Sequence, residues 1–186
     1  MVVTQGQLRA GQDVLILGVG GGVSSTAVQI AKLCGARVFV TSSSDAKLER
    51  ALGLGADVGI NYTKEDWAKA VFDKTGRRGV DLVIENVGAS TWKQSLRSLR
   101  KGGRLVTCGA TTGPIGETDI RVVFWNQISI VGSTMASTRE FQDVMRLFFQ
   151  GKLRAVIDQV VPLKDGAAAQ QRLGEGQQFG KIVLTV

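Results

Sequence analysis

The stretch that decides the fold is VLILGVGGGVSSTAVQIAKLCGA, residues 14–36. A short apolar run leads into four glycines between positions 18 and 22, and small polar residues follow. Glycine loses much conformational entropy on folding, so such a cluster indicates that another group must approach the backbone closely. The pattern predicts a buried strand over 13–18, a tight turn and a helix that Gly35 ends, with an apolar face formed by Val23, Ala27, Ile30, Ala31 and Cys34.

The rest of the chain repeats this alternation of strand and helix. Further strands are predicted at residues 37–41, 58–62, 80–88, 103–109 and 127–133. Helices are predicted at 45–55, with Asp45 as the cap, and at 64–76, 90–100 and 137–151, and a long loop follows the strand at 103–109. The last of these helices is expected to face inward with Phe141, Val144, Met145 and Phe148. The tail holds a predicted strand near 156–162, a helix near 164–174 and a strand at 181–186.

Strands that alternate with helices at this spacing predict a parallel sheet covered by helices on both faces. We therefore expect an α/β fold, a doubly wound six-stranded parallel sheet of the Rossmann type with a short C-terminal helix–strand tail. Residues 1–155 would form the sheet domain and residues 156–186 the tail. In such a sheet a ligand binds at the carboxyl ends of the strands, where the strand order reverses.

Composition limits the possible functions. The 186 residues are 44% apolar and 21% charged, which is typical of one globular domain, and no apolar run is long enough to span a membrane. Histidine is absent, so the chain lacks the commonest general base and zinc ligand. The two cysteines, Cys34 and Cys108, show no metal-type spacing and fit core positions in a reduced, cytoplasmic setting.

The net charge of +7 also has a bearing on partners. The basic residues are scattered and form no block with interleaved aromatic residues, so we expect no nucleic-acid partner. A solvated surface and a binding site for a small anion both explain this charge.

A strand, a glycine turn and a helix N-terminus together predict an anion site, because backbone N–H groups and the helix dipole point at a phosphate. Gly18 would make the tight turn, and Gly20 and Gly21 would let the backbone approach a pyrophosphate. Val23 or Ser24 stands where the third glycine of the fingerprint is usual. Dinucleotide binding is the favoured interpretation. A turn without a ligand and a site for a methyl-donor nucleotide are the alternatives.

The end of the second predicted strand bears on the identity of the nucleotide. A ribose with free hydroxyls is usually held by Asp or Glu about 20 residues after the first glycine. Ser42, Ser43 and Ser44 occupy that edge instead, and Lys47 follows. Hydroxyls and a cation suit a 2′-phosphate, so the sequence favours NADP(H) over NAD(H), and the missing acid counts against a methyl donor.

With these residues in place, the chain resembles the cofactor-binding domain of the medium-chain dehydrogenases/reductases, the group of zinc-type alcohol dehydrogenases and quinone oxidoreductases. The resemblance rests on GVGGGVSSTAVQIAKLCGARVFVTSSSDAKLERALGLGADVGINY, DLVIENVG, GGRLVTCGATTG, ISIVGSTM and FGKIVLTV, which follow in family order over nearly the whole chain. It implies an oxidoreductase that transfers hydride between a nicotinamide and an alcohol, a carbonyl, or a quinone or enone.

The resemblance also implies roles for individual residues. The pyrophosphate turn corresponds to Gly18, Gly20, Gly21, Gly22 and Val23, and the positions that hold a 2′-phosphate correspond to Ser43, Lys47 and Tyr62. The loop near the adenosine and ribose corresponds to Asn86, Val87 and Gly88. The segments that face the nicotinamide carboxamide correspond to Gly109, Ala110, Thr111, Ser133, Thr134 and Met135. Simpler explanations stay open for three of these residues: a cap of the sheet edge for Tyr62, a solvated helix position for Lys47 and a plain turn for Thr111.

Family enzymes carry an N-terminal, barrel-like catalytic domain, which supplies the substrate pocket and, in one branch, the zinc ligands. This chain begins with MVVTQGQLRAGQDVLI, directly before the first predicted strand. We therefore expect the cofactor-binding half of a longer enzyme, with a tail that would pack on the missing domain. We expect neither a catalytic residue nor a metal in this chain, whereas zinc is possible in a longer parent enzyme.

Two other functions stay open, a non-enzymatic nucleotide-binding module and an association module. The predicted strand 127–133, QISIVGS, carries no charge or proline to block pairing with another chain. It also resembles the edge strand through which family dimers continue their sheets. The expected partners are thus a dinucleotide cofactor and a second copy of the chain, with no membrane.

Overall fold

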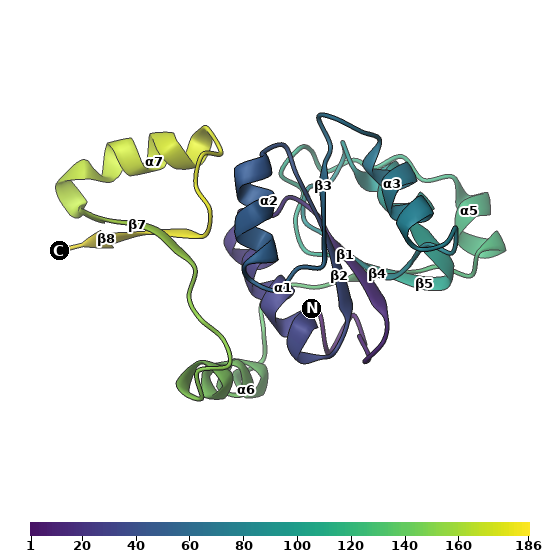
Figure 1. The fold of residues 1–186 in the computed structure, drawn as a ribbon, viewed down its shortest axis with the longest axis horizontal. Coiled ribbons are helices and arrows are strands. Elements are labelled where there is room, and N and C mark those ends of the chain that lie inside the picture. The colour runs from purple at the N-terminus through teal and green to yellow at the C-terminus, as the bar shows by residue number, and fades with distance from the viewer.

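The computed structural model describes all 186 residues and centres on one parallel sheet (Figure 1). Its strands are β1 (Asp13–Ile16), β2 (Arg37–Ser42), β3 (Val58–Asn61), β4 (Val80–Glu85), β5 (Leu99–Thr107) and β6 (Ser129–Gly132). They lie in the order β3-β2-β1-β4-β5-β6, and every neighbouring pair is parallel. The predicted Rossmann sheet is confirmed. Its order reverses between β1 and β4, which places the expected ligand crevice at the carboxyl ends of these two strands.

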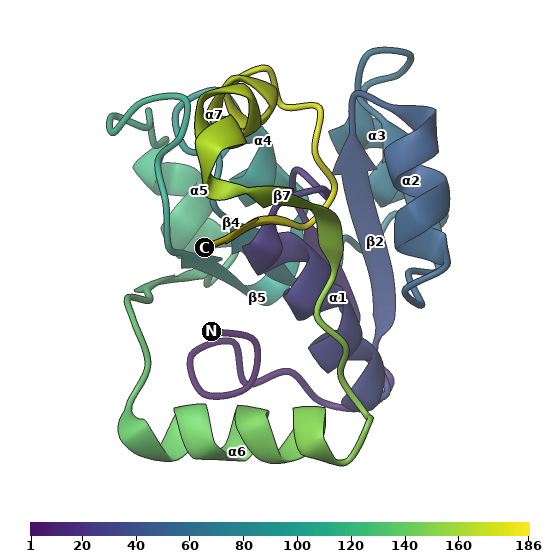
Figure 2. The same ribbon diagram turned by 90° about the vertical axis from the view of Figure 1, so that its left-hand side faces the viewer.

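Helices cover both faces of the sheet (Figures 1 and 2). On one face lie α1 (Gly22–Leu33) and α2 (Asp45–Leu52), and on the other α3 (Trp67–Lys74) and α4 (Trp92–Arg97). Three further helices are α5 (Ile120–Trp125), α6 (Thr138–Phe149) and α7 (Gly166–Gly174). None of the helices combines the length and the apolar character needed to cross a bilayer.

Successive residues of β1 contribute in turn to the apolar clusters on the two faces of the sheet. Val14 and Ile16 pack with Val28 of α1 in one apolar cluster, whereas Leu15 and Leu17 belong to the cluster on the opposite face. All five side chains are fully buried. Neighbouring residues of a strand point to opposite faces, so an uninterrupted apolar run indicates a sheet that is covered on both sides.

The buried face of α1 differs from the prediction at its first position. Ala27 and Ala31 are buried as expected, but Val23 is 43% exposed and Val28 takes a core position instead. The first turn of α1 lies at the carboxyl edge of the sheet, directly after the glycine turn. Helical periodicity alone does not show where the sheet ends.

The cap of α2 also differs from the prediction. Ser44 is the N-cap, and its hydroxyl accepts the N–H of Lys47 at 3.4 Å. Asp45 is the first helical residue, and its carboxylate accepts hydrogen bonds from Asn61 Nδ2 at 2.7 Å and Lys64 Nζ at 2.5 Å. These two bonds lower the pKa of Asp45 and join α2 to the end of β3.

Helix α5 forms inside a segment that was predicted to be loop. Asp119 caps it by accepting the N–H of Arg121 at 3.0 Å. The six residues IRVVFW read as an apolar run without a helical period, and none of them is buried. The capping acid was the signal that would have revealed this helix.

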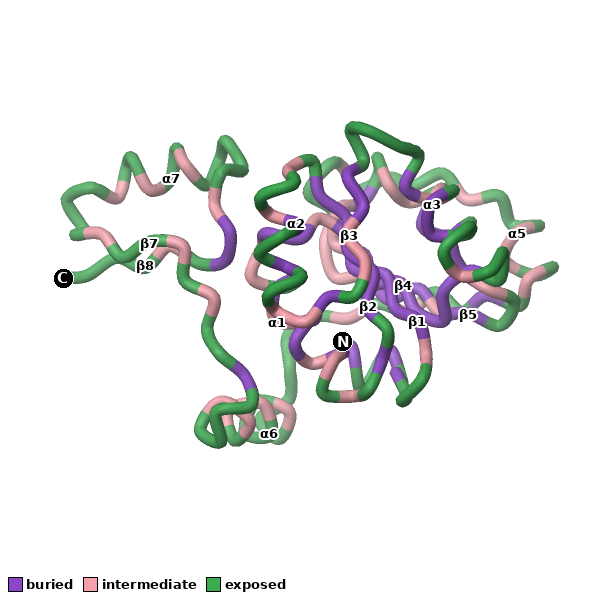
Figure 3. The backbone as a smooth tube through the Cα atoms, viewed as in Figure 1, coloured by how far each residue is buried: buried purple, intermediate pink, exposed green.

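Helix α6 forms as predicted, but the expectation that it faces inward is wrong. None of its residues is buried, and Phe141 is 61% exposed. Figure 2 shows α6 at the bottom of the molecule, away from the sheet, and Figure 3 shows that its residues are exposed or half-buried. An amphipathic pattern predicts an apolar stripe on a helix but does not say which surface covers it.

The C-terminal tail forms a small unit that projects from the sheet domain (Figure 1). It consists of β7 (Ile157–Pro162), a short 3₁₀ turn η1 (Leu163–Asp165), α7 and β8 (Lys181–Thr185), and β7 pairs with β8 in parallel. These elements contain no buried residue. One attachment is Phe179, which is 2% exposed in the apolar cluster that includes residues of α1 and α2, and whose ring centre lies 4.4 Å from the guanidinium of Arg50.

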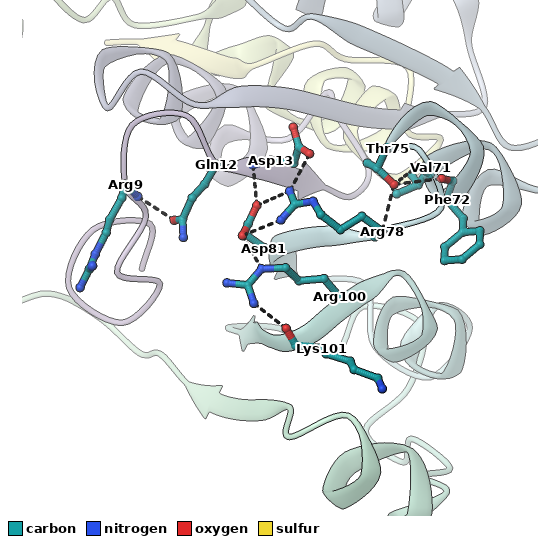
Figure 4. Close-up of polar contacts among 11 residues, drawn as sticks. Arg9, Gln12, Asp13, Val71, Phe72, Thr75, Arg78, Asp81, Arg100 and Lys101 are labelled. Carbon is teal, nitrogen blue, oxygen red and sulfur yellow. Dashed lines mark hydrogen bonds and ion pairs between the residues drawn. The ribbon is translucent and has the colours of Figure 1, made fainter.

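Charged residues hold the opposite, amino end of the sheet (Figure 4). Asp81 in β4 accepts hydrogen bonds from Arg78 Nη2 at 2.7 Å, from Arg100 Nε at 2.5 Å and from the backbone N–H of Asp13 at 2.9 Å. Burial alone would raise the pKa of Asp81, but the bonds from Arg78 and Arg100 outweigh burial and bring it to about 2. This cluster joins β1, β4 and β5 at the end away from the glycine turn.

Candidate functional site

The glycine turn between β1 and α1 has a shape that requires glycine. Gly18 and Gly20 have φ angles of +60° and +139°, a region that residues with a Cβ rarely adopt. The hydroxyl of Thr41, on the neighbouring strand β2, accepts the N–H of Gly18 at 3.2 Å. Ser24 is fully buried, and its hydroxyl lies 3.1 Å from the carbonyl oxygens of both Gly18 and Gly21. A small hydroxyl side chain thus closes the turn where a third glycine is usual.

The N-terminus of α1 has no protein side chain to cap it. Its N-cap is Gly21, and the first turn carries no acidic residue. A Cβ built on Gly21 would meet only the hydroxyl of Ser24, at 3.7 Å, so this position leaves open space. Since the first N–H groups of a helix have no partners within the helix and its dipole attracts negative charge, these features are those of a phosphate site.

Two lysines from distant parts of the chain lie over this turn. A Cβ built on Gly20 would lie 3.4 Å from the ammonium nitrogen of Lys47, and one built on Gly22 would lie 2.8 Å from that of Lys181. Lys47 also donates a hydrogen bond to the carbonyl of Gly176, and burial lowers its pKa. Lys181 was not predicted from the sequence, because only the folded chain brings β8 to the turn.

A cleft of about 740 Å³ opens at the carboxyl edge, where the strand order reverses. Tyr62 lines it and is 48% exposed. Lys47 does not line it and Ser43 is exposed, so the structure does not gather the three predicted 2′-phosphate residues at one point. The lining residues are Leu17, Gly18, Thr41, Tyr62, Thr63, Lys64, Glu65, Asp66, Trp67, Val87, Ser90, Thr91, Gln94 and Thr112.

The loops after β4 and β5 brace each other beside this cleft. The carbonyl of Asn86 accepts the hydroxyl of Thr111 at 3.1 Å. The carbonyl of Val87 accepts both the N–H and the hydroxyl of Thr112, each at 2.8 Å. The structure therefore brings together the predicted residues of both loops, Asn86, Val87, Gly88, Gly109, Ala110 and Thr111.

The predicted residues after β6 lie further from the cleft. The N–H of Ser133 donates to the carbonyl of Thr107 at 2.8 Å, which holds the ends of β5 and β6 together. Thr134 is exposed, and Met135 is 93% exposed with a φ of +52°. None of these residues lines the cleft.

Two buried side-chain oxygens at this edge lack a protein partner, Asn86 Oδ1 and Gln178 Oε1. Gln178 lines a second hollow of about 340 Å³ between the glycine turn and α7, to which Gly21, Gly22 and Lys181 also contribute. Buried polar atoms in native proteins are nearly always hydrogen-bonded, so the unpartnered oxygen of Gln178 beside the glycine turn fits a polar ligand.

The residues of this chain do not fit a zinc site. No group of three or more His, Cys, Asp or Glu side chains lies together in a way that would hold an ion. Cys34 and Cys108 are free and half-buried, and burial raises the pKa of both thiols, which disfavours the thiolate that binds metal.

In dinucleotide-binding Rossmann domains, a parallel sheet with this strand order carries a glycine-rich turn at the point where the order reverses. The present chain has that sheet and that turn. The sequence pattern of the zinc-binding dehydrogenase family matches residues 22–150, and the chain belongs to this family. The resemblance to the cofactor-binding domain of medium-chain dehydrogenases/reductases is thereby confirmed.

Known relatives agree with this assignment. The zinc-type alcohol dehydrogenase-like protein YogA of Leptosphaeria maculans is 30% identical over 194 residues, which cover 100% of this chain and 54% of the relative. A solved NAD-dependent alcohol dehydrogenase has a TM-score of 0.94 at 44% identity, covering 100% of this chain and 54% of that one. The 2-octenoyl-CoA carboxylase reductase CinF, solved in complex with NADP and 2-octenoyl-CoA, has a TM-score of 0.92 at 32% identity, covering 99% and 45%. The chain thus spans about half the length of the proteins that it matches.

Proposed function

We propose that this chain is the NADP(H)-binding domain of an oxidoreductase that transfers hydride between the nicotinamide and an alcohol, a carbonyl, or a quinone or enone substrate. The observation that carries the proposal is the uncapped N-terminus of α1, which has no acidic residue and lies beneath the ammonium groups of Lys47 and Lys181. Family membership and the NADP complex of CinF support it.

In this proposal the N–H groups of Gly21, Gly22 and Val23 hold the pyrophosphate, and Lys181 balances its charge. The adenosine occupies the cleft beside Tyr62 and Val87. The backbone of residues 109–111 and 133–135 faces the carboxamide. The nicotinamide supplies the hydride chemistry when it is bound, and the residues of this chain bind and orient the cofactor. The substrate pocket and any proton donor would come from the rest of a longer protein.

The preference for NADP(H) over NAD(H) rests on the end of β2. Asp45 is the nearest acid, but Asn61 and Lys64 already engage its carboxylate, which leaves it poorly placed to accept ribose hydroxyls. Ser43 is exposed beside it, and Lys47 is the nearby cation. The solved relative with 44% identity is an NAD-dependent alcohol dehydrogenase, so titration with both cofactors tests this preference directly.

The test is a fluorescence titration of the chain with NADPH and NADH, with Gly21→Val as the matched variant. Gly21 has extended backbone and open space around its Cβ position, so the variant is expected to fold normally. Its side chain would occupy the phosphate position, so binding of both cofactors is expected to disappear. Retained binding in a folded Gly21→Val variant would show that the glycines serve only the turn.

We also propose the division into a nucleotide domain, residues 1–155, and a tail, residues 156–186, that packs on a further domain. The support is apolar surface on the tail, where Val160, Leu173 and Leu184 are between 41% and 59% exposed. The tail is already attached to the nucleotide domain, since Gly180 donates its N–H to the carbonyl of Gly20 at 2.7 Å. A second domain would cover the opposite face of the tail.

We further propose that the chain forms a homodimer through residues 127–133. The strand β6 lies at an edge of the sheet, and Ile130 on it is 39% exposed. An apolar edge without charge is a template for pairing with a second copy. A cytoplasmic setting is proposed as well, because both cysteines are free thiols.

A further inference from the structure

Glu85 is a buried acid that contacts no cation. It is the last residue of β4, is fully shielded from solvent and takes part in none of the ion pairs of the structure. Burying a charged group is costly unless hydrogen bonds compensate it. An apolar residue would fill this strand position at no such cost, so the acid requires another explanation.

The hydrogen bonds of Glu85 supply that explanation. Its Oε1 accepts the backbone N–H groups of Val87 at 2.7 Å and Gly88 at 3.0 Å. Its Oε2 accepts the hydroxyls of Thr91 at 2.9 Å and Ser95 at 2.5 Å, on the following turn and α4. A backbone N–H can only donate, so the loop requires an acceptor at this point.

The loop that Glu85 holds forms part of the cleft. The side chain of Val87 lines the cleft and would lie 3.6 Å from a Cβ on Gly18, so it sits beside the glycine turn. Gly88 has a φ of +93°, and a Cβ there would come within 2.8 Å of Ala110. The backbone at Gly88 is therefore packed closely against the loop after β5, which limits movement of the loop after β4. The direction of the two N–H groups therefore sets where Val87 lies.

We propose that Glu85 is a positioning residue for the dinucleotide, which fixes the peptide units of Val87 and Gly88 from beneath and so places Val87 against the turn at Gly18. The inference rests on the proposed function, because it concerns the same cleft. Glu85 itself does not contact the cofactor.

The matched variants are Glu85→Gln and Ser95→Ala. The glutamine keeps the size of the side chain and can turn its oxygen toward the loop, with its N–H₂ facing the hydroxyls of Thr91 and Ser95, but it removes the charge that strengthens both loop bonds. The Ser95→Ala change removes the hydrogen bond that the Ser95 hydroxyl donates to Glu85, which lies on the side facing α4 and away from the loop. Both changes are expected to lower the melting temperature, and only the first is expected to act on the cleft.

The readout is the dissociation constant for NADPH, measured by fluorescence titration with the full chain. We expect at least a fivefold rise in Glu85→Gln and less than a twofold change in Ser95→Ala. Hydrogen exchange at Val87 and Gly88 is expected to accelerate in the glutamine variant alone. Equal affinity of wild type and Glu85→Gln, or equal loss in both variants, would overturn the inference.

A third variant covers failure of the glutamine chain to fold. Glu85→Asp keeps the charge but withdraws the carboxylate by one methylene from the loop, and it is expected to weaken NADPH binding at least threefold. Wild-type affinity in this variant would also overturn the inference. A wild-type chain that binds neither NADPH nor NADH would be a different result, since it would refute the proposed function together with the inference that rests on it.

Discussion

At the scale of single residues, Lys47 and Lys181 lie over the same turn, but each is expected to contact a different phosphate group of the proposed cofactor. Lys47 comes from the first turn of α2, directly after the serines that end β2, whereas Lys181 opens β8 and lies at Gly22. A 2′-phosphate distinguishes NADPH from NADH, and the pyrophosphate is common to both. The two lysines should therefore affect the two cofactors differently.

For Lys47→Ala we expect weaker binding of NADPH and unchanged binding of NADH. A hydrogen bond to a charged group contributes about 1.5–3 kcal/mol, which is roughly tenfold or more in affinity. Calorimetric titration with each cofactor measures this. An equal loss for both cofactors would assign Lys47 to the pyrophosphate and remove the argument for NADP(H).

For Lys181→Ala we expect an equal loss of affinity for NADPH and NADH, of roughly tenfold, because the pyrophosphate is the group beside Gly22. The same calorimetric experiment measures it, and Lys152 in the connection between α6 and β7 offers an exposed control lysine. If Lys181→Ala behaves like Lys152→Ala, the side chain only covers the turn.

Sequence patterns predicted the residues whose roles depend on neighbours along the chain. They did not predict residues whose roles depend on contacts with distant segments. The glycines of the turn were predictable, because strand, turn and helix are adjacent along the chain. Asp45 was misassigned as a cap because the neighbouring Ser44 has the same capping chemistry and only the fold shows that Asn61 and Lys64 take the acid. Lys181 was missed because more than a hundred residues separate it from the turn that it covers.

At the scale of elements, the cluster of Asp81, Arg78, Arg100 and Asp13 joins three strands at the amino edge of the sheet (Figure 4). The pKa of Asp81 is about 2 in the folded chain against an ordinary value of 3.8. A carboxyl group with a lowered folded-state pKa stabilises the fold above its unfolded-state pKa, and this stabilisation is lost as the pH falls through the folded-state value. The difference corresponds to about 2 kcal/mol.

We therefore expect the free energy of unfolding to fall between about pH 4 and pH 2 in the wild type. Asp81→Asn should cost about 2 kcal/mol at pH 7 and much less at pH 2, because the folded-state carboxyl group is then about half protonated and most of the stabilisation from its charge is lost. Urea unfolding curves across this pH range measure the difference. A constant difference at all pH values would mean that the side chain stabilises the fold by packing and not by its charge.

The positions of most elements were predictable from the sequence, but the surface that an outlying helix faces was not. The strands of the sheet lie where the apolar runs predicted them, and the runs of the two central strands, β1 and β4, are buried on both faces. The exposure of Phe141 on α6 was not predictable, since the stripe of an amphipathic helix does not specify its partner. Helix α5 escaped prediction because six apolar residues show no clear period.

At the scale of the whole molecule, exposed apolar groups lie at the sheet edge as well as on the tail and α6. Ile130 on the edge strand β6 is 39% exposed, and Trp125 at the end of α5 is 74% exposed. The sheet ends at β6 with unpaired backbone groups, which a second copy would satisfy by extending the sheet.

Sedimentation velocity of the chain and of Ile130→Lys tests this arrangement. We expect a dimeric parent and a monomeric variant, because a lysine on each copy would place like charges at the paired edges. A monomeric parent would rule out the dimer. A variant that stays dimeric would move the interface to another surface, such as the exposed apolar side chains of the tail.

We predict that a dinucleotide binds at the carboxyl edge of this sheet and nowhere else on the chain. The most direct measurement is the change in backbone amide chemical shifts by nuclear magnetic resonance as NADPH is added to the labelled chain. We predict saturable changes at Gly18–Ser24 and at Asn86–Gly88, the two segments that meet beside the cleft, and none at Asp13, Arg78 or Asp81 on the opposite edge. Saturable changes centred on that opposite edge, or no saturable change with either NADPH or NADH, would rule out a dinucleotide site at the carboxyl edge.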